Sequence, residues 1–189
     1  MMKKYFEGRI EHNSETIRRL YKAEYDTYEM KKVIIRYLAG ALLAAGGLLG
    51  QFPIIIQAIL MMIGCWLIVS RDFPSKCRAD RALENRKQAL PVIRSVFCDD
   101  CISLDGEGHM DMKYDCVQYL VDVKGYYFLF FGRNSACMID GQTLLPDSAD
   151  EFKQFVSQKT GLEWRESTFW LNMNLQDIIT MVKSRRGRQ

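Results

Sequence analysis

Formal charge is almost absent from one long stretch of the sequence. Between Val33 and Val69 the chain holds a single charged side chain, Arg36. A run of this length without acids, interrupted at Pro53, is typical of two consecutive membrane-spanning helices. A soluble protein with two buried core helices is the alternative interpretation.

A large excess of charge of one sign is also lacking. The 189 residues carry a net charge of +3, and so small an imbalance argues against nucleic acid as the main partner. The charge is unevenly distributed, with +3 over 1–36, +4 over 71–95, −6 over 96–160 and +2 over 161–189. An acidic module therefore lies between a basic membrane flank and a basic tail.

Histidine is scarce, and the two examples, His12 and His109, have no candidate nucleophile beside them in the sequence. The turn at 105–108 contains glycine but lacks the phosphate-loop pattern, so we interpret it as a hairpin loop. Three carboxylates indicate the solvated face of a sheet: Asp111, Asp115 and Asp122. We therefore expect a chain that is not an enzyme, with no catalytic, cofactor-binding or metal-binding residues and no cofactor.

Cysteine occurs six times, but a single spacing, Cys98-Asp-Asp-Cys101, resembles a metal or redox site. A zinc knuckle needs a second pair of ligands, and Cys116 and Cys137 occur singly in predicted strands. Structural thiols are the leading interpretation, with a metal site and a redox pair as alternatives. Because the first apolar run begins only at Val33, after a charged leader and not a signal peptide, we expect the cysteines to face a reducing cytosol.

Two apolar segments of 18 residues, 33–50 and 52–69, form a predicted transmembrane hairpin. Each helix would be roughly 27 Å long at about 1.5 Å per residue, close to the ~30 Å hydrocarbon core of a bilayer. Basic side chains flank both outer ends and are absent from the turn at 50–53, which predicts a multi-pass cell-membrane protein with both termini cytoplasmic. These cations are Lys31, Lys32, Arg36, Arg71, Lys76, Arg78 and Arg81.

Small residues recur in the first segment as Gly40-x-x-x-Ala44 and Gly46-x-x-x-Gly50. They allow close helix approach, either within the hairpin or between chains of a homo-oligomer, although glycine is also simply common in membrane helices. Arg36 lies about one turn into the segment, so its guanidinium can extend back to the headgroups. Trp66 suits the interfacial aromatic belt.

Helical patterns are predicted on both sides of the hairpin. Residues 4–10 could form a short strand, after which Ser14 is the candidate N-cap of a helix that could run unbroken into the first span. Its apolar face comprises Ile17, Leu20, Tyr21 and Tyr28.

A second, basic helix is predicted to begin at Pro74-Ser75, and Pro91 is expected to kink or end it. Its shared apolar face comprises Ala79, Ala82, Leu83, Leu90 and Ile93. Beside an anionic leaflet such a helix could bind lipid headgroups; the simpler interpretation is that its charge only sets the topology.

From Val96 onward the apolar residues follow the period of two that is typical of strands. Predicted strands cover 96–98, 101–104, 109–112, 115–123, 126–131 and 136–139. In 115–123 one face carries Val117, Tyr119, Val121 and Val123, and Leu120 falls on the opposite, polar face. The segment 126–131 is apolar on both faces, so we expect a central strand covered on both sides.

One helix is predicted to follow the strands. It begins at the capping box Ser148-Ala-Asp-Glu151, carries Phe152, Phe155 and Val156 on one face, and stops at Gly161. Antiparallel strands closed by one C-terminal helix indicate an antiparallel β-sheet or barrel that is pleckstrin-homology-like. The fold class is thus an α+β membrane protein with a two-helix transmembrane hairpin.

Five parts are predicted along the chain. They are a cytoplasmic N-terminal strand and helix (1–32), a transmembrane helical hairpin (33–70), a basic juxtamembrane helix (71–95), a pleckstrin-homology-like β-domain with its closing helix (96–161), and an amphipathic helix with a basic tail (162–189).

Three segments resemble motifs of the YcxB-like family of bacterial membrane proteins. Residues 113–121, Lys-Tyr-Asp-Cys-Val-Gln-Tyr-Leu-Val, resemble "K-W-x-x-I-x-x-I-x", with Tyr114 in place of the tryptophan. Residues 126–131 resemble the strand "Y-I-F-I-Y-I", and residues 150–155 resemble the helix "E-E-F-x-x-F". The resemblance implies a pleckstrin-homology-like fold and a cytoplasmic membrane location, and it implies no particular activity.

The last part of the chain has its own pattern. After Trp164 and Trp170, an apolar stripe formed by Leu171, Leu175, Ile178, Ile179 and Val182 precedes Arg185, Arg186 and Arg188. This pattern fits a helix lying on the membrane surface. It equally fits a helix that packs on the β-domain or on a partner.

We therefore expect a membrane-anchored, non-enzymatic interaction module whose cytoplasmic domain binds a protein partner or itself. The lipid bilayer is its integral partner, and nucleic acid is not expected to bind. An immunity-type protein that protects the membrane against a toxin, or an accessory subunit of a transporter, are the alternatives. Two spans without intramembrane acids leave no evident ion path for a stand-alone transporter.

Overall fold

A computed structural model describes residues 4–85 and 90–166 of the chain. These residues fold into two compact units. We call residues 11–93 the helical unit, and residues 1–10 with 94–189, as far as they are described, the β-domain. The predicted segment 1–32 is shared between the units, since its strand belongs to the β-domain and its helix to the helical unit.

The helical unit begins with α1 (Ser14–Tyr28), and its N-cap is Asn13, not the predicted Ser14. The Asn13 side chain accepts hydrogen bonds of 2.9 Å from the backbone N–H groups of Glu15 and Thr16. In return the Thr16 hydroxyl accepts a 2.7 Å hydrogen bond from the Asn13 N–H. Three N–H groups at the start of the helix are thereby satisfied, as in a capping box.

A break at Glu29 separates α1 from α2 (Met30–Leu49), so the helix does not run unbroken into the first span. The Glu29 N–H still donates to the Tyr25 carbonyl at 2.9 Å, and the Glu29 carbonyl already accepts from Lys32 and Val33. Glu29 therefore ends one helix and begins the next, with a backbone bent out of the helical region at φ −118° and ψ 20°.

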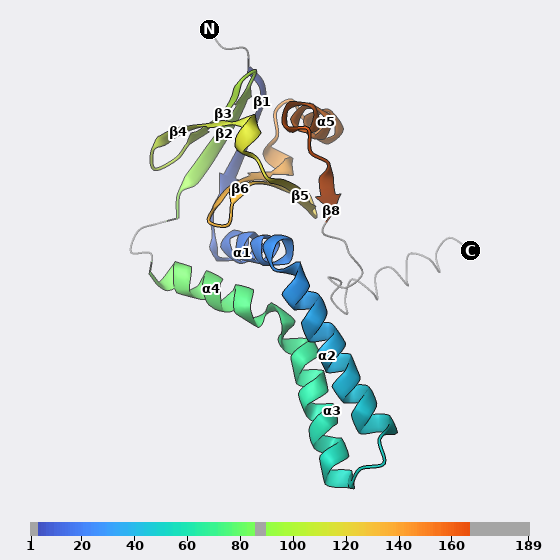
Figure 1. The fold of residues 1–189 in the computed structure, drawn as a ribbon. Helices are drawn as coiled ribbons and strands as arrows, with labels where there is room; N and C mark the ends of the chain where they lie inside the picture. Colours follow the sequence, from blue (N-terminus) through green and yellow to red (C-terminus); the bar gives the residue numbers. More distant parts are fainter. Residues whose placement is uncertain (1–3, 86–89, 167–189) are drawn as a thin grey trace, which may run out of the picture. The chain divides into compact units, whose positions relative to one another are not determined.

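The predicted hairpin is present as α2 and α3 (Ile54–Val69), joined by an uncharged turn (Figure 1). The second helix begins two residues later than predicted because Pro53 occupies its N-cap position. A short helical turn, η1 (Ser70–Asp72), links α3 to α4 (Phe73–Glu84). Both α2 and the helical run that starts with α3 are long and apolar enough to cross a membrane.

Three glycines allow α2 and α3 to pack closely against each other. A Cβ atom added at Gly64 would lie 2.7 Å from the Gly40 carbonyl oxygen and 2.7 Å from the Ala44 nitrogen. One added at Gly47 would lie 2.8 Å from the Gln57 carbonyl oxygen, whereas one added at Gly46 would meet nothing within 4 Å. Gly40, Gly47 and Gly64 thus belong to the contact within the hairpin, and Gly46 does not.

The basic helix α4 is shorter than predicted. It contains Pro74 in its first turn, as expected, and it ends at Glu84. Ile93 does not continue it, because residues Val92–Cys98 form the strand β2. Pairing of Arg94–Phe97 with β3 decides the conformation of this segment.

The β-domain contains two four-stranded sheets and not a closed barrel, as far as the described residues extend. One sheet has the order β1-β2-β3-β4 and the other β7-β6-β5-β8. Its strands are β1 (Lys4–Glu11), β2, β3 (Cys101–Asp105), β4 (His109–Lys113), β5 (Tyr119–Val123), β6 (Tyr126–Gly132), β7 (Ser135–Asp140) and β8 (Trp164–Glu166). The two sheets do not join between β4 and β5, because the short helix η2 (Tyr114–Cys116) separates these strands and each pairs within its own sheet.

The strand β1 joins the first sheet to the segment that follows β7. It lies beside β2, and Glu7 forms an ion pair with Arg94 of that strand. On its other side Glu7 exchanges two backbone hydrogen bonds of 2.7 Å with Leu145. Thr143 lies in the short helix η3 (Gly141–Thr143). Its hydroxyl accepts a 2.9 Å hydrogen bond from the Arg9 N–H and donates one of 2.6 Å to the Arg9 carbonyl.

The helix α5 (Ala149–Thr160) covers the core of the β-domain, as predicted. Phe152 is fully buried and contacts the rings of Phe6, Phe97 and Tyr127 from three strands, with ring centroids 5.0 to 5.5 Å apart. Gly161 ends the helix in the left-handed conformation, at φ 68°. Ser148 is the N-cap, but its side chain makes no capping hydrogen bond.

The predicted strand 115–123 is correct only in its second half. Residues 114–116 form η2, and Leu120, assigned to the polar face, is fully buried in the core. The pattern misled because Asp122, on the same face, forms an ion pair with Lys153 of α5. The strand β8, which pairs in parallel with β5, was not predicted.

The central strand β6 agrees with the prediction. It lies between β5 and β7, and Tyr127, Phe128, Leu129 and Phe130 are all buried, so both of its faces are covered. The predicted C-terminal helix, from Leu171 to the terminal arginines, lies outside the described residues.

Gly47→Ala should weaken the hairpin, because the added methyl group overlaps the backbone of α3. We expect a loss of about 1–3 kcal/mol, the usual cost of overpacking, seen as a lower midpoint of thermal unfolding in detergent. The neighbouring Gly46→Ala is the matched control and should be neutral or slightly stabilising. Equal effects of the two changes would contradict the assignment of Gly47 to the helix contact.

Candidate functional site

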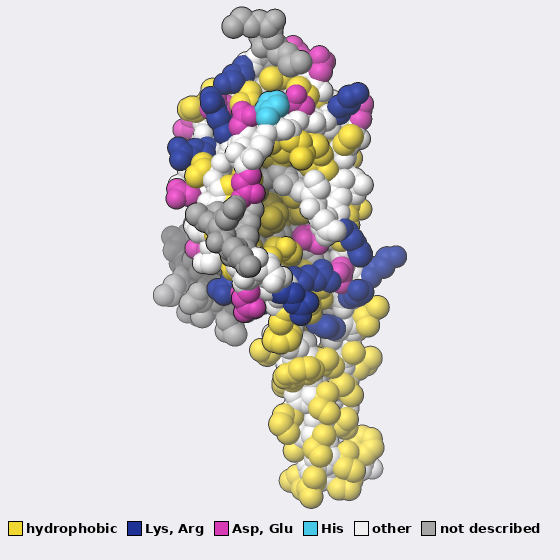
Figure 2. Space-filling view, turned by 90° about the vertical axis from the view of Figure 1, so that its left-hand side faces the viewer, with side chains coloured by type: hydrophobic (Ala, Val, Ile, Leu, Met, Phe, Trp, Pro, Cys, Tyr) yellow, Lys and Arg dark blue, Asp and Glu magenta, His cyan; other side chains and the backbone are white. Residues whose placement is uncertain are grey.

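Charged side chains gather within the helical unit at the end of the hairpin opposite its turn, which we call the outer end. We call this group the charged collar; it comprises Lys22, Asp26, Glu29, Lys32, Tyr37, Arg71, Asp72 and Arg78. On the face drawn in Figure 2, Lys and Arg side chains crowd directly above an almost uniformly apolar hairpin. The collar marks the boundary between apolar and charged parts of the helical unit.

Glu29 holds three helices together. Its carboxylate accepts hydrogen bonds from Lys32 of α2 at 2.9 Å and from Arg78 of α4 at 2.8 Å, while its backbone caps α1. Glu29 is 7% exposed, so these bonds are only partly screened by water. The Lys32 and Arg78 hydrogen bonds lower the pKa of Glu29 to about 2, which keeps the carboxylate ionised at all physiological pH values.

Arg71 is the second centre of the collar and is 6% exposed. Its Nε and Nη2 atoms donate to both carboxylate oxygens of Asp72, at 2.7 and 3.3 Å, and its Nη1 donates to the Tyr37 hydroxyl at 3.1 Å. Lys22 of α1 forms a 3.2 Å ion pair with Asp72. This network joins α1, α2 and the turn between α3 and α4, so the outer ends of both hairpin helices are fixed.

Asp26 differs from the other collar acids. Its side chain is 8% exposed, and its Oδ1 atom has no hydrogen-bond partner in the described part of the chain. Burial raises the pKa of Asp26 to about 6, and the charge of Asp72 adds to this effect, although Lys22 and Arg71 oppose it. Near neutral pH this carboxylate is therefore ionised at a cost in stability.

Several of the cations that flank the predicted spans take part in the collar. Arg71, Arg78 and Lys32 are each paired with a collar acid. This network was not predicted, because the cations were interpreted without the acids beside them. A signal was present, since Asp26 and Glu29 lie three residues apart immediately before the first span and Asp72 lies just after the second.

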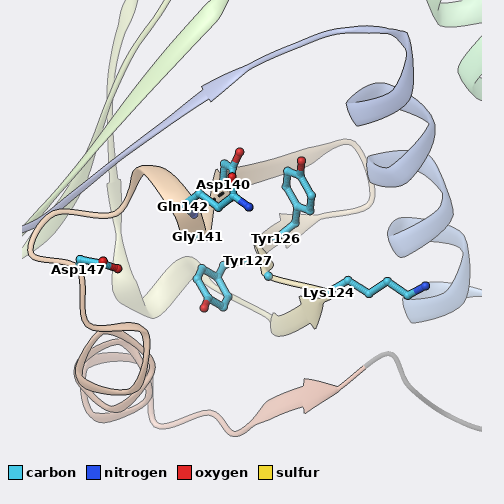
Figure 3. Close-up of a pocket in the computed structure, with 8 residues that line it drawn as sticks. Lys124, Tyr126, Tyr127, Asp140, Gly141, Gln142 and Asp147 are labelled. Carbon is cyan, nitrogen blue, oxygen red and sulfur yellow. Dashed lines mark hydrogen bonds between the residues drawn. The ribbon is translucent and has the colours of Figure 1, made fainter. Parts of the chain in front are cut away.

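A shallow polar hollow of about 400 Å³ lies on the β-domain beside the turn between β5 and β6. Figure 3 shows that its labelled side chains do not converge, since Lys124 extends away from it and Asp147 lies on its opposite side. The Asp140 carboxylate accepts the Gln142 N–H at 3.0 Å and so caps η3. We therefore find no arrangement in this hollow that would hold a specific ligand.

The six cysteines differ in how far they are buried. Cys98 and Cys137 are buried and Cys101 is half-buried, and all six cysteines are free thiols. Burial raises the pKa of Cys137 to about 11, and burial also raises the pKa of Cys101. Protonated thiols are poor metal ligands and nucleophiles. No group of three His, Cys, Asp or Glu side chains suited to a metal ion occurs in the described residues.

His109 lies at the exposed end of the β3–β4 hairpin, as predicted for the loop before it. Its Nδ1 atom is 2.6 Å from Asp105, and its Nε2 atom is 3.3 Å from Asp111. The hydrogen bond with Asp105 raises the pKa of His109. Both partners are exposed carboxylates, so this cluster is an ordinary surface ion pair that contributes little to stability.

Asp26→Asn should stabilise the protein at neutral pH. A folded-state pKa of about 6, against an ordinary 3.8, means that the ionised form destabilises the fold by about 3 kcal/mol above pH 6 and not at all below pH 4. Thermal unfolding in detergent should therefore show wild-type stability falling between pH 4 and 6, and a flatter curve for Asp26→Asn.

The control is Asp80→Asn, which removes an exposed carboxylate paired with Arg18 in the same unit and should keep the wild-type slope. Glu7 and Glu29 have pKa values lowered to about 2, so their effect on stability is lost only below about pH 4.5. Superimposable pH curves for wild type and Asp26→Asn would contradict the burial of this carboxylate.

Glu29→Gln should lower the free energy of unfolding by about 1–3 kcal/mol, because it removes two charge-assisted hydrogen bonds from a buried position. Glu15→Gln is the control, since Glu15 forms an exposed pair with Arg19 one helical turn away. That change should cost less than about 0.5 kcal/mol. A loss at Glu29 no larger than at Glu15 would show that the collar does not hold the helices together.

No protein-family model, no curated protein and no solved structure matches this chain. The resemblance to the YcxB-like family accordingly stays a prediction.

Proposed function

We propose that the chain is a membrane-anchored, non-enzymatic interaction module. In this proposal α2 and α3 cross the bilayer, and the β-domain lies in the cytoplasm, where it binds a protein partner or a second copy of itself. The observation that carries the proposal is the exposure of the apolar surface of the hairpin.

Seventeen large apolar side chains between residues 30 and 73 are exposed, with Leu49 at 85% and Ile54 at 81%. Moving one such side chain out of water is worth roughly 1.5–3 kcal/mol, so the whole set favours hydrocarbon by tens of kcal/mol. Surfaces of this size and character are not left in water by soluble monomers.

The alternative of two core helices in a soluble protein requires burial of these helices. In the most apolar 18-residue window of each, only 17% and 11% of the residues are buried. The residues that are buried in α2 and α3 are mainly the glycines of the helix contact. Helices that pack through glycine and expose leucine and isoleucine are typical of membrane proteins.

The β-domain is built from segments before and after the hairpin, which supports placing both ends of the hairpin on the same side of the membrane. The strand β1 precedes the hairpin, and its neighbours β2 and Leu145 follow it, yet all belong to one folded domain. A domain built from both flanks needs an even number of membrane crossings. Cations at the outer ends and an uncharged turn at 50–53 favour the cytoplasm for that domain.

The proposed interaction role of the β-domain is supported by its edge strand β4. Among the described strands β4 pairs only with β3, so one row of its backbone groups is available for strand addition. Four of its five residues are exposed, and Met110 is an apolar side chain on this edge. The pleckstrin-homology-like assignment remains part of the proposal, supported by the packing of α5 over a curved set of strands.

Cysteine labelling tests the anchorage and its orientation together. Cys116 is exposed on the β-domain, and Gln51→Cys would place a thiol in the turn of the hairpin. A membrane-impermeant maleimide should label the thiol introduced in the turn in intact cells, and Cys116 only after permeabilisation, as read by peptide mass spectrometry. Release of the protein from membranes by alkaline carbonate, or labelling of Cys116 in intact cells, would refute the proposal.

A further inference from the structure

We infer that the outer end of the hairpin binds the headgroups of anionic phospholipids through four cations: Lys31, Arg36, Lys76 and Arg81. We call these residues the headgroup patch. This inference rests on the proposed membrane insertion and adds to it a preference for lipids of a particular charge.

The four cations differ from their neighbours in having no acid to neutralise them. The other cations nearby are paired: Lys22 and Arg71 with Asp72, Lys32 and Arg78 with Glu29, and Arg18 with Asp80. None of the four headgroup-patch side chains makes a hydrogen bond or an ion pair with any described part of the chain. Their charges are therefore left for a ligand outside the protein.

The length of the hairpin places these cations at the level of the headgroups. With 20 and 16 residues, α2 and α3 are roughly 30 and 24 Å long, no longer than the ~30 Å hydrocarbon core. The collar cannot stand away from the bilayer surface while the turn reaches the opposite side. Arg36, inside the second turn of α2, must extend its guanidinium toward the lipid phosphates, to which it can donate two parallel hydrogen bonds.

The direction of α4 places its cations, Lys76 and Arg81, at the level of the headgroups as well. Within the helical unit α4 turns sharply away from the axis of α3 (Figure 1), so it runs along the membrane surface when the hairpin is upright. Its Ala79 is fully buried, and Arg81, two positions later, points to the opposite side of the helix. The exposed aromatic side chains Trp66 and Phe73 accompany these cations, as expected at an interface.

The sign of the net charge selects the ligand. The paired collar residues nearly neutralise one another, so the four cations of the headgroup patch dominate the local potential. Zwitterionic headgroups would leave this charge unmatched, whereas a phosphodiester with a net negative charge would match it. If the cations served only to orient the hairpin, no preference between the two kinds of lipid would result.

Quenching of Trp66 by brominated lipids tests the inference. The full chain would be placed in vesicles of phosphatidylcholine and phosphatidylglycerol in which one or the other lipid is brominated, with Trp66→Phe giving the signal of the other tryptophans. We expect brominated phosphatidylglycerol to quench Trp66 several-fold more than brominated phosphatidylcholine at equal mole fraction. The difference should shrink in about 0.5 M salt, since exposed charges are screened.

In the variant Arg36→Gln/Arg81→Gln the ratio of quenching by the two brominated lipids should fall by up to roughly fivefold for each cation removed. This factor corresponds to about 1 kcal/mol for each cation near an anionic surface. Lys31, Lys32, Lys76 and Arg78 remain to preserve the orientation. Arg36→Lys/Arg81→Lys should retain most of the preference. The matched control is Lys113→Gln/Arg133→Gln, which removes two exposed charges from the β-domain and should leave the preference unchanged.

The outcomes separate the inference from the proposal on which it rests. If the chain floats with the vesicles and both lipids quench Trp66 equally, or if the control lowers the preference as much as the Arg36/Arg81 variant, the lipid site is refuted and the anchorage stands. If the chain does not float with vesicles of either composition, both are refuted. Loss confined to the Arg36/Arg81 variant supports the inference.

Discussion

Two buried charges, Glu29 and Arg71, impose the strongest constraint on the helical unit. A charge removed from water must be matched by partners in good geometry, or it destabilises the fold by several kcal/mol. Glu29 finds Lys32 and Arg78, and Arg71 finds Asp72 and Tyr37. Lys32 and Asp72 are near in sequence, whereas Arg78 and Tyr37 come from the other side of the hairpin, so both charges have all their partners only when the helix ends are together.

The hairpin itself depends on a different interaction. In a bilayer, lipid tails are as apolar as leucine, so helices associate through close packing more than through the hydrophobic effect. Gly40, Gly47 and Gly64 supply that packing along the length of α2 and α3. If the hairpin crosses the bilayer as proposed, the packing between α2 and α3 acts in lipid and the collar ion pairs act near water, so each stabilises a different part of the helical unit.

The sequence could predict the features that depend on local signals. The apolar spans, the doubly covered strand at 126–131 and the stop at Gly161 each follow from a pattern within a few residues, and the structure contains them. Features that depend on distant partners were missed or wrong. Leu120 was assigned to the polar face because Asp122 beside it has an unforeseen partner, Lys153, on α5.

The same reason explains the errors in the sheets and in the collar. Whether strands close into a barrel depends on pairing between β4 and β5, and no local pattern reports the short helix that separates them. The collar could have been anticipated from its acids, but its geometry could not, because Glu29 and Arg78 are far apart in the sequence. The unmatched carboxylate of Asp26 likewise has no signature apart from its place on a buried helix face.

The position of β1 has a consequence for how the chain is made. During synthesis β1 leaves the ribosome before its neighbour β2, which emerges only after the helices α1 to α4 have been made. Until then its Phe6 and Ile10, which are buried in the finished domain, have no core to enter. In the proposed topology the hairpin would insert while β1 is still unpaired on the cytoplasmic side, so closure of the β-domain would follow insertion.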